Sequence, residues 1–459
     1  MNSITITGAL KLPKTEAIRK ALTFPNPFDD EKSFKAFFET KTHLIIPRAY
    51  PTDLTGSTLS VIDVPCEYIL GSNYTLRDYQ STAKEEIIEY FKDKPYGELL
   101  LTAQCGAGKS YVLSSIIAGL GQRVLILSHL SMLSTQLSQE LKNGLPTAHI
   151  EILSSKSDTN NLPDIGIATF QLLQNAVLLD VIKNHYGIVI VDEAENSFST
   201  SRLRVLFSLR PKYQLFLTAT PSKTLLNQTH GLQYLIGNKV VNMTAGDEHS
   251  IHTKHLMVDM APLQWYSPSD PNKYKVSLGK FMLTSGVIHN VCSWVSQLHK
   301  GGVQGTIWII ADLAKVQDAM AQELETLGLS VRIIRGTTSN KKRVEILKEI
   351  SEGKVSTLIG SAPLAAGISI KELSIGIRLM PNSSSEELLQ QQSGRLKRFI
   401  EFKTVQNPLW LDFNIPGSLS YGANKRYGIY KGTTHGVAKC KPEDVVDTII
   451  AMISIKEPQ

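Results

Sequence analysis

The sequence has no hydrophobic run that reaches the roughly 18 residues needed for a membrane-spanning helix. It has only 4 cysteines, at 66, 105, 292 and 440, and no two of them form a C-x-x-C pair. That spacing excludes zinc ribbons and thioredoxin-like redox sites. The start of the chain lacks a basic stretch followed by an apolar one, so no signal peptide is predicted. These absences favour a cytoplasmic protein in a reducing compartment.

The chain also has little excess charge of either sign, because 48 lysines and arginines against 42 acidic residues leave a net charge of +6. This balance permits a nucleic-acid partner, but it is unlike the polybasic tail of a packaging protein. Basic residues concentrate in residues 391–441, where nine stand against Glu401 and Asp412. Two interpretations of this segment stay open, a solvated surface and a face that contacts phosphates.

The length of 459 residues predicts about three domains. After about 70 irregular residues, interpreted as a small accessory domain of mixed structure, short apolar strands alternate with helical patterns. The predicted strands are ELLLT, RVLILS, IGIATF, GIVIVDEA and YQLFLTAT in a first series, and GTIWIIA, SVRIIRG and KVSTLIGSA in a second. This alternation predicts parallel sheets covered by helices on both faces. The polar stretch of about 240–280 between the two series predicts a linker and a long loop.

The segment AQCGAGKS, residues 103–110, lies between a predicted strand and a predicted helix, as a phosphate-binding loop requires. Glycines let backbone N–H groups face the β-phosphate, and the helix start adds a favourable partial charge. Lys109 would bridge the β- and γ-phosphates, and the Ser110 hydroxyl would hold Mg²⁺. A strict motif begins with glycine, where this chain has Ala103. The predicted nucleotide contacts of the loop are Gly106, Ala107, Gly108, Lys109 and Ser110.

The segment IVIVDEAEN places two carboxylates directly after the apolar strand 188–191. Taken alone, this pattern is also typical of an acidic pair on a protein surface. In one sheet with a phosphate loop, Asp192 would ligate Mg²⁺ through water, and Glu193 would polarise the attacking water. The pair therefore predicts nucleotide hydrolysis.

The motifs GAGKS, VDEAE, LTATP and QQSGRLKR follow in the order of the superfamily 2 helicases, and the chain resembles that family over roughly residues 74–400. The resemblance implies an α/β fold of two tandem RecA-like parallel-sheet lobes with a small N-terminal accessory domain. The expected divisions are 1–72 for the accessory domain, 73–238 for the ATP-binding lobe, and 239–459 for the second lobe with its basic segment. The implied cofactors are ATP and Mg²⁺, with hydrolysis between the two lobes.

The resemblance also assigns roles to single residues. LRDYQ resembles the Q motif, in which Gln80 would read the adenine while Arg77 or Tyr79 packs beside it; a helix-start glutamine is the alternative. Thr218 and Thr220 resemble motif III, which couples hydrolysis to the bound strand. Further candidates would touch the nucleic-acid backbone, although such residues also occur as strand-end caps. They are Ser128, His129, Thr169, Gln171, Arg335 and Ser361.

QQSGRLKR matches the sixth motif at Gln391, Gly394, Arg395 and Arg398. A phosphoryl transition state spreads negative charge over the γ-oxygens, and an arginine that neutralises it is worth roughly 10³–10⁵ in rate in comparable NTPases. A helical basic patch is the alternative. Gly367 matches motif V as a nucleotide contact, but Ser369 stands where many members of the family have aspartate.

Finer details are similar to phage UvsW-type helicases, which remodel branched DNA. These details are the GIS form of motif V, the LIIPRAY segment and the late KRYGIY stretch. The leading hypothesis is an ATP-dependent DNA helicase or translocase that works as a monomer on forks and junctions. It would serve branch migration in DNA recombination, repair or replication, inside the bacterial host cell if a phage encodes it. An RNA helicase and an ATP-gated nucleic-acid clamp without motor turnover stay open as alternatives.

Overall fold

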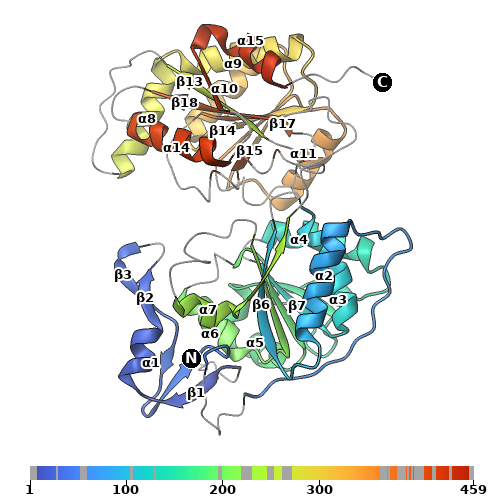
Figure 1. Cartoon of the computed structure of the whole chain (residues 1–459). Coiled ribbons are helices and arrows are strands. Elements are labelled where there is room, and N and C mark those ends of the chain that lie inside the picture. The colour runs from blue at the N-terminus through green and yellow to red at the C-terminus, as the bar shows by residue number, and fades with distance from the viewer. Residues whose placement is uncertain are drawn as a thin grey trace. The chain divides into compact units, whose positions relative to one another are not determined.

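The computed structural model divides into two compact units, Met1–Gly246 and Asp247–Gln459, each built on a seven-stranded parallel sheet (Figure 1). The predicted α/β class with tandem parallel-sheet lobes is confirmed. The structure describes the chain outside residues 1–7, 27–28, 52–58, 104–106, 129–130, 195–198, 219–229, 245–252, 261–270, 362–369, 371–372, 380–388, 390–391, 394–395, 397–407, 416–419, 434–436 and 454–459. Within the described ranges, no helix has both the length and the apolar character to span a bilayer.

The sheet of the first unit has the strand order β12-β6-β11-β10-β7-β9-β8. Its strands are β6 (Gly97–Ala103), β7 (Val124–Ser128), β8 (Ile150–Ile152), β9 (Ile165–Thr169), β10 (Ile188–Val191), β11 (Tyr213–Thr218) and β12 (Lys239–Met243). Short runs of leucine, isoleucine and valine form these strands, as expected for a parallel sheet that is covered on both faces. Every residue of β6 and β10 is buried.

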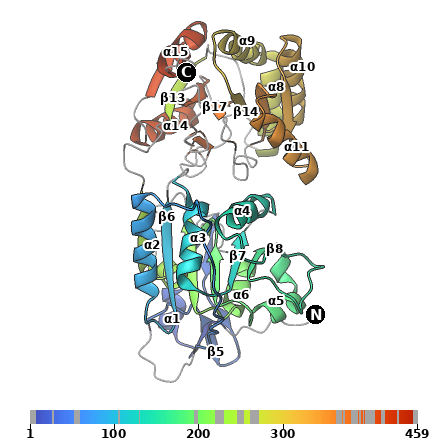
Figure 2. The same ribbon diagram turned by 90° about the vertical axis from the view of Figure 1, so that its right-hand side faces the viewer.

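Helices cover both faces of this sheet (Figure 2). They are α2 (Asp78–Phe91), α3 (Lys109–Leu120), α4 (Ser131–Gly144), α5 (Ala176–Ile182), α6 (Thr200–Ser208) and α7 (His230–Ile236). Successive side chains of a strand point to opposite faces. Leu99 and Leu101 therefore pack with α2, α3 and α4, whereas Leu100 packs with α5, α6 and α7.

Residues 8–50 form an N-terminal module within the first unit. Its elements are β1 (Leu10–Pro13), α1 (Glu16–Ala21), β2 (Thr23–Asn26), β3 (Asp29–Lys35), β4 (Phe38–Glu39) and β5 (His43–Ile46). The strands form an antiparallel sheet in the order β1-β5-β4 and a β2–β3 hairpin. Leu12 and Leu44 are buried in the same hydrophobic cluster as Phe207 of α6. The module therefore shares its core with the parallel sheet.

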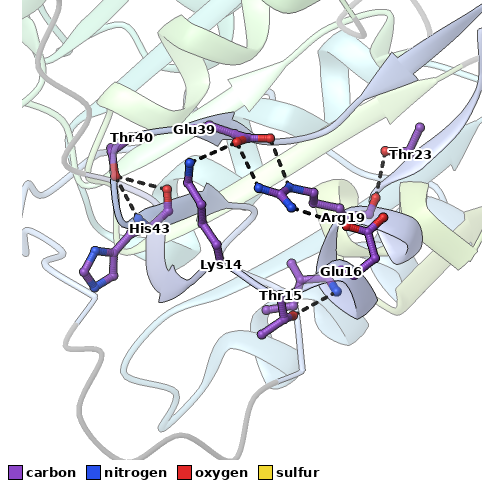
Figure 3. A network of polar contacts seen from close by, with 9 residues as sticks. Lys14, Thr15, Glu16, Arg19, Thr23, Glu39, Thr40 and His43 are labelled. Carbon is purple, nitrogen blue, oxygen red and sulfur yellow. Dashed lines mark hydrogen bonds and ion pairs between the residues drawn. The ribbon is translucent and has the colours of Figure 1, made fainter.

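An exposed ion network lies across the N-terminal module. Glu39 of β4 accepts two hydrogen bonds of 3.2 Å from the Arg19 guanidinium of α1 and pairs with Lys14 at 3.2 Å (Figure 3). Arg19 also pairs with Glu16 at 3.3 Å. The hydrogen bonds from Arg19 are the main reason that the pKa of the Glu39 carboxyl is lowered. The network links α1 to β4, but solvent screening keeps the contribution of such exposed pairs small.

A buried ion pair attaches the N-terminal module to the parallel sheet. The Arg48 guanidinium pairs with Glu98 of β6 and donates to the backbone oxygens of Pro211 (2.6 Å) and Lys212 (3.1 Å). Arg48 and Glu98 are only 5% and 4% exposed. Residues 62–66 extend this attachment through backbone hydrogen bonds to the segments that precede β7 and β11.

The sheet of the second unit has the strand order β15-β16-β14-β17-β18-β13-β19. Its strands are β13 (Lys254–Asp259), β14 (Thr306–Ile310), β15 (Val331–Ile334), β16 (Thr357–Gly360), β17 (Leu373–Arg378), β18 (Leu409–Asn414) and β19 (Val437–Cys440). The helices are α8 (Pro271–Thr284), α9 (Val287–Lys300), α10 (Ala314–Thr326), α11 (Asn340–Ser351), α14 (Ser420–Thr433) and α15 (Val445–Ile453). One face of the sheet is apolar and shares a cluster with α8, α9, α10 and α15.

A buried polar network joins β18 to α14. Arg426 donates to both carboxylate oxygens of Asp412, at 2.8 and 3.2 Å, and the Tyr430 hydroxyl donates to the same carboxylate at 2.8 Å. Burial, reinforced by the Asp412 charge, raises the pKa of Tyr430. Trp410 donates from its indole N–H to the Tyr430 hydroxyl at 3.1 Å. Charge as well as apolar contact therefore fixes α14 to β18.

This network removes one residue, Arg426, from the basic surface expected for residues 391–441. Arg426 is only 1% exposed and is neutralised by Asp412, so it fits neither a solvated face nor a phosphate-contacting face. The described lysines of the segment are exposed, and they are Lys425, Lys431, Lys439 and Lys441.

The stretch of about 240–280 contains more than the predicted linker and loop. β12 pairs with β6 in the first sheet, and β13 lies inside the second sheet between β18 and β19. Strand pairing buries the interior of β13 despite its polar ends, so residues 254–259 of this stretch form a sheet strand. Because β12 belongs to the first sheet, the two units divide after Gly246, beyond the expected boundary at residue 238.

Candidate functional site

Two of the predicted motifs meet at the carboxyl edge of the first sheet. β6 leads into the phosphate loop, and β10 leads to Asp192 and Glu193. β11 lies between these strands and ends at the buried Thr218, whereas Thr220 lies outside the described residues. The carboxyl ends of parallel strands share one edge, and open α/β sheets bind ligands there.

The described part of the phosphate loop runs from Ala107 to Ser110, and Gly106 lies outside the described residues. Gly108 has a left-handed backbone, with φ 81° and ψ 38°, and caps α3. The left-handed conformation favours glycine at this position, and a Cβ there would lie 2.5 Å from the Gln80 Nε2. The first N–H groups of a helix have no acceptor within the helix and therefore attract anions. This part of the loop fits a phosphate group.

The residues at this edge also fit Mg²⁺ shared with a nucleotide. Among the residues that the structure describes, no cluster of three or more His, Cys, Asp or Glu side chains could hold a metal by itself. Mg²⁺ commonly uses only one or two carboxylates and takes its other ligands from phosphates and water. Ser110, half-buried at the start of α3, and Asp192 are the residues that would hold it.

The acidic pair has an unusual backbone. The Asp192 N–H donates to the Leu127 oxygen of β7 at 2.9 Å, so strand pairing continues one residue past β10. The Asp192 carboxylate accepts a hydrogen bond from the Glu193 N–H at 3.0 Å. Glu193 has φ 52°, a left-handed conformation that costs a residue other than glycine about 1–3 kcal/mol. Such strain is concentrated at functional sites, and the surrounding contacts hold Glu193 in it.

The start of α2 contacts the phosphate loop. The Gln80 Nε2 donates to the Ala107 oxygen at 2.9 Å, and the Tyr79 hydroxyl donates to the same oxygen at 3.1 Å. The Arg77 N–H donates to the Gln80 Oε1 at 3.1 Å, and the Arg77 guanidinium contacts the Tyr79 hydroxyl at 3.4 Å. The structure therefore brings the predicted Q-motif residues to the loop, with the Gln80 amide turned toward the loop backbone.

Two tyrosines beside this contact are absent from the sequence prediction. The rings of Tyr74 and Tyr111 stack, with centroids 4.3 Å apart and an interplanar angle of 15°. The Thr75 N–H donates to the Tyr111 hydroxyl at 3.1 Å. Burial raises the pKa of Tyr74 to about 12. A tyrosine directly after GKS, with another just before LRDYQ, is the sequence signal that could have indicated this pair.

The predicted nucleic-acid contacts of the first unit follow β7 and β9. Ser128 and Thr169 pair in register at the ends of these strands. Ser128 is 1% exposed, and the Thr169 hydroxyl accepts a turn hydrogen bond from the Leu172 N–H at 3.2 Å. Gln171 is exposed, and His129 lies outside the described residues. The structure thus presents Gln171 to solvent and covers the Ser128 side chain.

Arg335 and Ser361 directly follow β15 and β16, at the carboxyl edge of the second sheet. The Arg335 Nε donates to the Gln317 Oε1 at 2.8 Å, and the guanidinium pairs with Asp318. Gln317 in turn donates to the Ala311 oxygen, directly after β14, at 2.6 Å. α10 therefore holds Arg335 at this edge and supplies an opposite charge.

The sixth motif is described in part. Gln392 and Leu396 are fully buried, and Ser393 is 6% exposed. The Thr253 hydroxyl donates to the Ser393 oxygen at 3.3 Å, which anchors the segment beside β13. The predicted nucleotide contacts of motifs V and VI lie outside the described residues, and they are Gly367, Gln391, Gly394, Arg395 and Arg398.

Comparison with protein-family models assigns the chain to a family. The model "Type III restriction enzyme, res subunit" matches residues 73–223, and the model "Helicase conserved C-terminal domain" matches residues 291–400. The two segments fall in different units and together take in more than half of the chain. The chain belongs to helicase superfamily 2.

The chain is 22% identical over 346 residues to "DNA 3'-5' helicase XPB" of Mycobacterium tuberculosis, and the match covers 71% of the chain and 58% of the relative. The protein named "Putative ATP-dependent RNA helicase L396" of Acanthamoeba polyphaga mimivirus is 23% identical over 197 residues, covering 42% of the chain and 37% of the relative. UvrABC system protein B of Chlorobium chlorochromatii is 35% identical over 92 residues, covering 20% of the chain and 13% of the relative. The chain therefore spans less than two thirds of the length of these relatives.

Solved structures share the fold of this chain. S. cerevisiae Dbp5 bound to RNA and ADP BeF3 has a TM-score of 0.59 at 15% identity, covering 82% of this chain and 97% of that one. The ATP-dependent Type ISP restriction-modification enzyme LlaBIII bound to DNA has a TM-score of 0.57 at 14% identity, covering 80% of this chain and 31% of that one.

Proposed function

We propose that this protein is an ATP-dependent DNA helicase or translocase that remodels branched DNA, such as forks and junctions. One observation carries the proposal: the start of α3 after the phosphate loop and the acidic pair after β10 share one edge of one sheet, in a chain of this superfamily. An anion-binding helix start beside two carboxylates suits a Mg²⁺–nucleotide complex.

The first unit would hold and activate the nucleotide. The Lys109 ammonium would bridge the β- and γ-phosphates, and the left-handed turn at Gly108 would let backbone N–H groups face them. Mg²⁺ on Ser110 and Asp192 would neutralise part of the phosphate charge. Glu193 would accept a proton from the attacking water.

The second unit would sense the same nucleotide. Arg395 and Arg398 would neutralise the charge that spreads over the γ-oxygens, with Gln391 and Gly367 as further contacts. Thr218 and Thr220 would couple hydrolysis to the bound strand. Each cycle would then change the grip on the nucleic-acid backbone through residues such as Gln171, Arg335 and Ser361.

DNA is the proposed track because the relative named as a DNA helicase aligns over most of this chain. The UvsW-like details of the sequence support branched DNA as the form of that track. Contacts directed at the backbone rather than at bases predict strong salt dependence of binding. The exposed lysines of residues 425–441 and the N-terminal module are the proposed additional DNA contacts.

Rates of ATP hydrolysis with single-stranded DNA, forked DNA, four-way junctions and single-stranded RNA test the proposal. We expect the largest stimulation from forks or junctions, with strand displacement or fork reversal in parallel assays. Greater stimulation by RNA than by any DNA would identify an RNA helicase instead. Hydrolysis with no displacement or reversal would leave a translocase.

A clamp without motor turnover is tested by separating ATP binding from hydrolysis. We expect Glu193→Gln to retain ATP binding while losing hydrolysis and strand displacement, because only the proton acceptor is removed. We expect Lys109→Ala to lose ATP hydrolysis and strand displacement, while circular dichroism shows a folded chain. A half-buried lysine at the start of α3 carries little stability. Full remodelling activity in Glu193→Gln would support the clamp.

A further inference from the structure

Helix α6, which follows the acidic pair along the chain, is held from two sides. Toward the N-terminal module, the Phe207 ring meets the Phe38 ring edge to face at 5.7 Å, and the Arg204 guanidinium lies 5.5 Å from the centre of the Phe38 ring. Toward the sheet, Leu203 and Val205 are buried in the hydrophobic cluster that the module and the sheet share. These contacts fix the place of the first turn of the helix.

That first turn presents an arginine without a counter-charge. The Arg202 guanidinium lies 5.8 Å from the centre of the Phe170 ring, and Phe170 directly follows β9 at the carboxyl edge of the sheet. Within the described ranges, no carboxylate or other acceptor pairs with the half-buried Arg202 side chain. Burial lowers its pKa. By contrast, Arg48 and Arg123 of the same unit each pair with a carboxylate.

The surroundings of Arg202 favour an anion. Partial burial removes water from the guanidinium, and the start of a helix carries a partial positive charge that repels a cation. The Phe170 ring attracts the guanidinium but has no net charge to neutralise it. Arginine keeps its proton at neutral pH, so Arg202 stays charged. A phosphate group would supply the missing negative charge, and its oxygens match the planar guanidinium fork.

The residues beside Arg202 indicate which phosphate this is. Gln171, next to Phe170, is an expected contact of the nucleic-acid backbone and is exposed. The other expected contacts that the structure describes in the first unit are less accessible, because Ser128 is 1% exposed and the Thr169 hydroxyl accepts a turn hydrogen bond. A neutral amide cannot neutralise a phosphate charge. Arg202 supplies a cation at the same edge of the sheet.

We propose that Arg202 binds a backbone phosphate of the DNA strand that Gln171 contacts. This inference rests on the proposed function, and Arg202 lies outside every motif of the helicase series. Because α6 continues the segment that begins at Asp192 and Glu193, Arg202 joins the bound strand to the acidic pair through one stretch of chain. A strand gripped there acts directly on the segment that carries the hydrolytic carboxylates.

The salt dependence of binding separates a phosphate contact from a packing role, since its slope counts the phosphates that the protein neutralises. The test measures the affinity of the full chain, without ATP, for a short labelled single strand of DNA and for RNA of the same sequence, over a range of salt. Arg202→Met removes the charge but keeps an unbranched stem against the Phe170 ring. Arg202→Lys keeps the charge without the fork.

The matched control removes a lysine charge elsewhere in the first unit. Lys142 is exposed in the last turn of α4, which leads to the start of β8 and therefore lies at the opposite edge of the sheet. Lys142→Gln should change neither the affinity nor the slope. An equal fall of the slope in this variant would show a general effect of charge and would overturn the inference.

We expect Arg202→Met to weaken DNA binding by roughly tenfold at low salt, the range for one lost hydrogen bond to a charged group. The slope of log affinity against log salt should fall by about 0.7, the value for one phosphate of a single strand. Arg202→Lys should keep the slope and lose part of the affinity.

An unchanged slope in Arg202→Met overturns the inference even if the affinity falls, because altered packing does not change the number of neutralised phosphates. A slope that falls for RNA and not for DNA overturns the assignment to a DNA strand. If the unmodified protein binds neither strand, the proposed function itself fails. Circular dichroism checks that each variant is folded, and Arg202→Gln carries the test if Arg202→Met is not.

Discussion

The buried pair of Arg48 and Glu98 makes a quantitative test of how the N-terminal module is attached. Arg48→Ala removes a guanidinium that pairs with the Glu98 carboxylate and donates to the backbone oxygens of Pro211 and Lys212. Glu98 is 4% exposed, so water does not replace the lost partner. Removing one member of a buried ion pair costs about 3–5 kcal/mol. Since a domain is typically stable by about 5–15 kcal/mol, the change is a large fraction of the total.

The distribution of tryptophan provides the assay. All tryptophans of the chain belong to the second unit, and they are Trp265, Trp294, Trp308 and Trp410. Tryptophan fluorescence during urea unfolding therefore follows the second unit, whereas far-ultraviolet circular dichroism follows both. We expect Arg48→Ala to shift the unfolding of the first unit to lower urea concentration. This shift should appear in circular dichroism and not in fluorescence. The fluorescence transition should stay in place.

The pH dependence of this variant has a defined sign. Burial raises the pKa of Glu98 even beside Arg48, and loss of the Arg48 charge raises it further. A carboxyl whose pKa is higher in the folded state than in the unfolded state binds its proton more tightly when folded. The penalty is therefore complete above the folded-state pKa and is relieved as the pH falls through it. The difference in free energy of unfolding between the variant and the unmodified protein should therefore become smaller in acid.

A second variant serves as the control. Replacing both members, as Arg48→Met with Glu98→Leu, removes the unpaired charge and should recover most of the lost stability. If Arg48→Ala lowers the free energy of unfolding by less than about 1 kcal/mol, the pair contributes no more than an exposed ion pair. That result would refute the reasoning. A loss that does not depend on pH would show that the Glu98 charge is not its cause.

Three further outcomes are expected. Arg426→Ala leaves the buried Asp412 carboxylate without its guanidinium. The free energy of unfolding followed by fluorescence should therefore fall by about 3–5 kcal/mol, and a fall below about 1 kcal/mol would contradict this. Gly376→Ala places a methyl group 2.6 Å from the Trp410 ring. Overpacking should then cost the second unit about 1–3 kcal/mol in the same urea experiment, and no change would mean that the ring moves freely. Arg398→Ala should lower the rate of ATP hydrolysis far more than the affinity for ATP, measured by steady-state rates and nucleotide titration, and equal losses would make Arg398 a simple binding residue.

The fold class followed from local patterns because each pattern has a local physical cause. Short apolar runs such as IVIV and LLLT pair as buried parallel strands, and GAGKS supplies the left-handed turn at Gly108 that a phosphate loop needs. The apolar alternation did not reveal β13, because its polar ends and short length resemble a loop until β18 and β19 pair with it. Strand pairing over long separations is not visible in a local window.

The candidate site divides in the same way. The sequence by itself determined the identity and order of the motif residues, because the chemistry of Lys109, Asp192 and Glu193 depends on residue type and on the strand or helix that each one ends or begins. Only the tertiary structure decided the partners of Gln80, Arg48 and Arg426. Gln80 contacts a carbonyl 27 residues away, and Arg48 contacts one 163 residues away. A side chain that can bond either a ligand or the protein shows its partner only when the chain has folded, because burial and proximity decide which of the two is in reach.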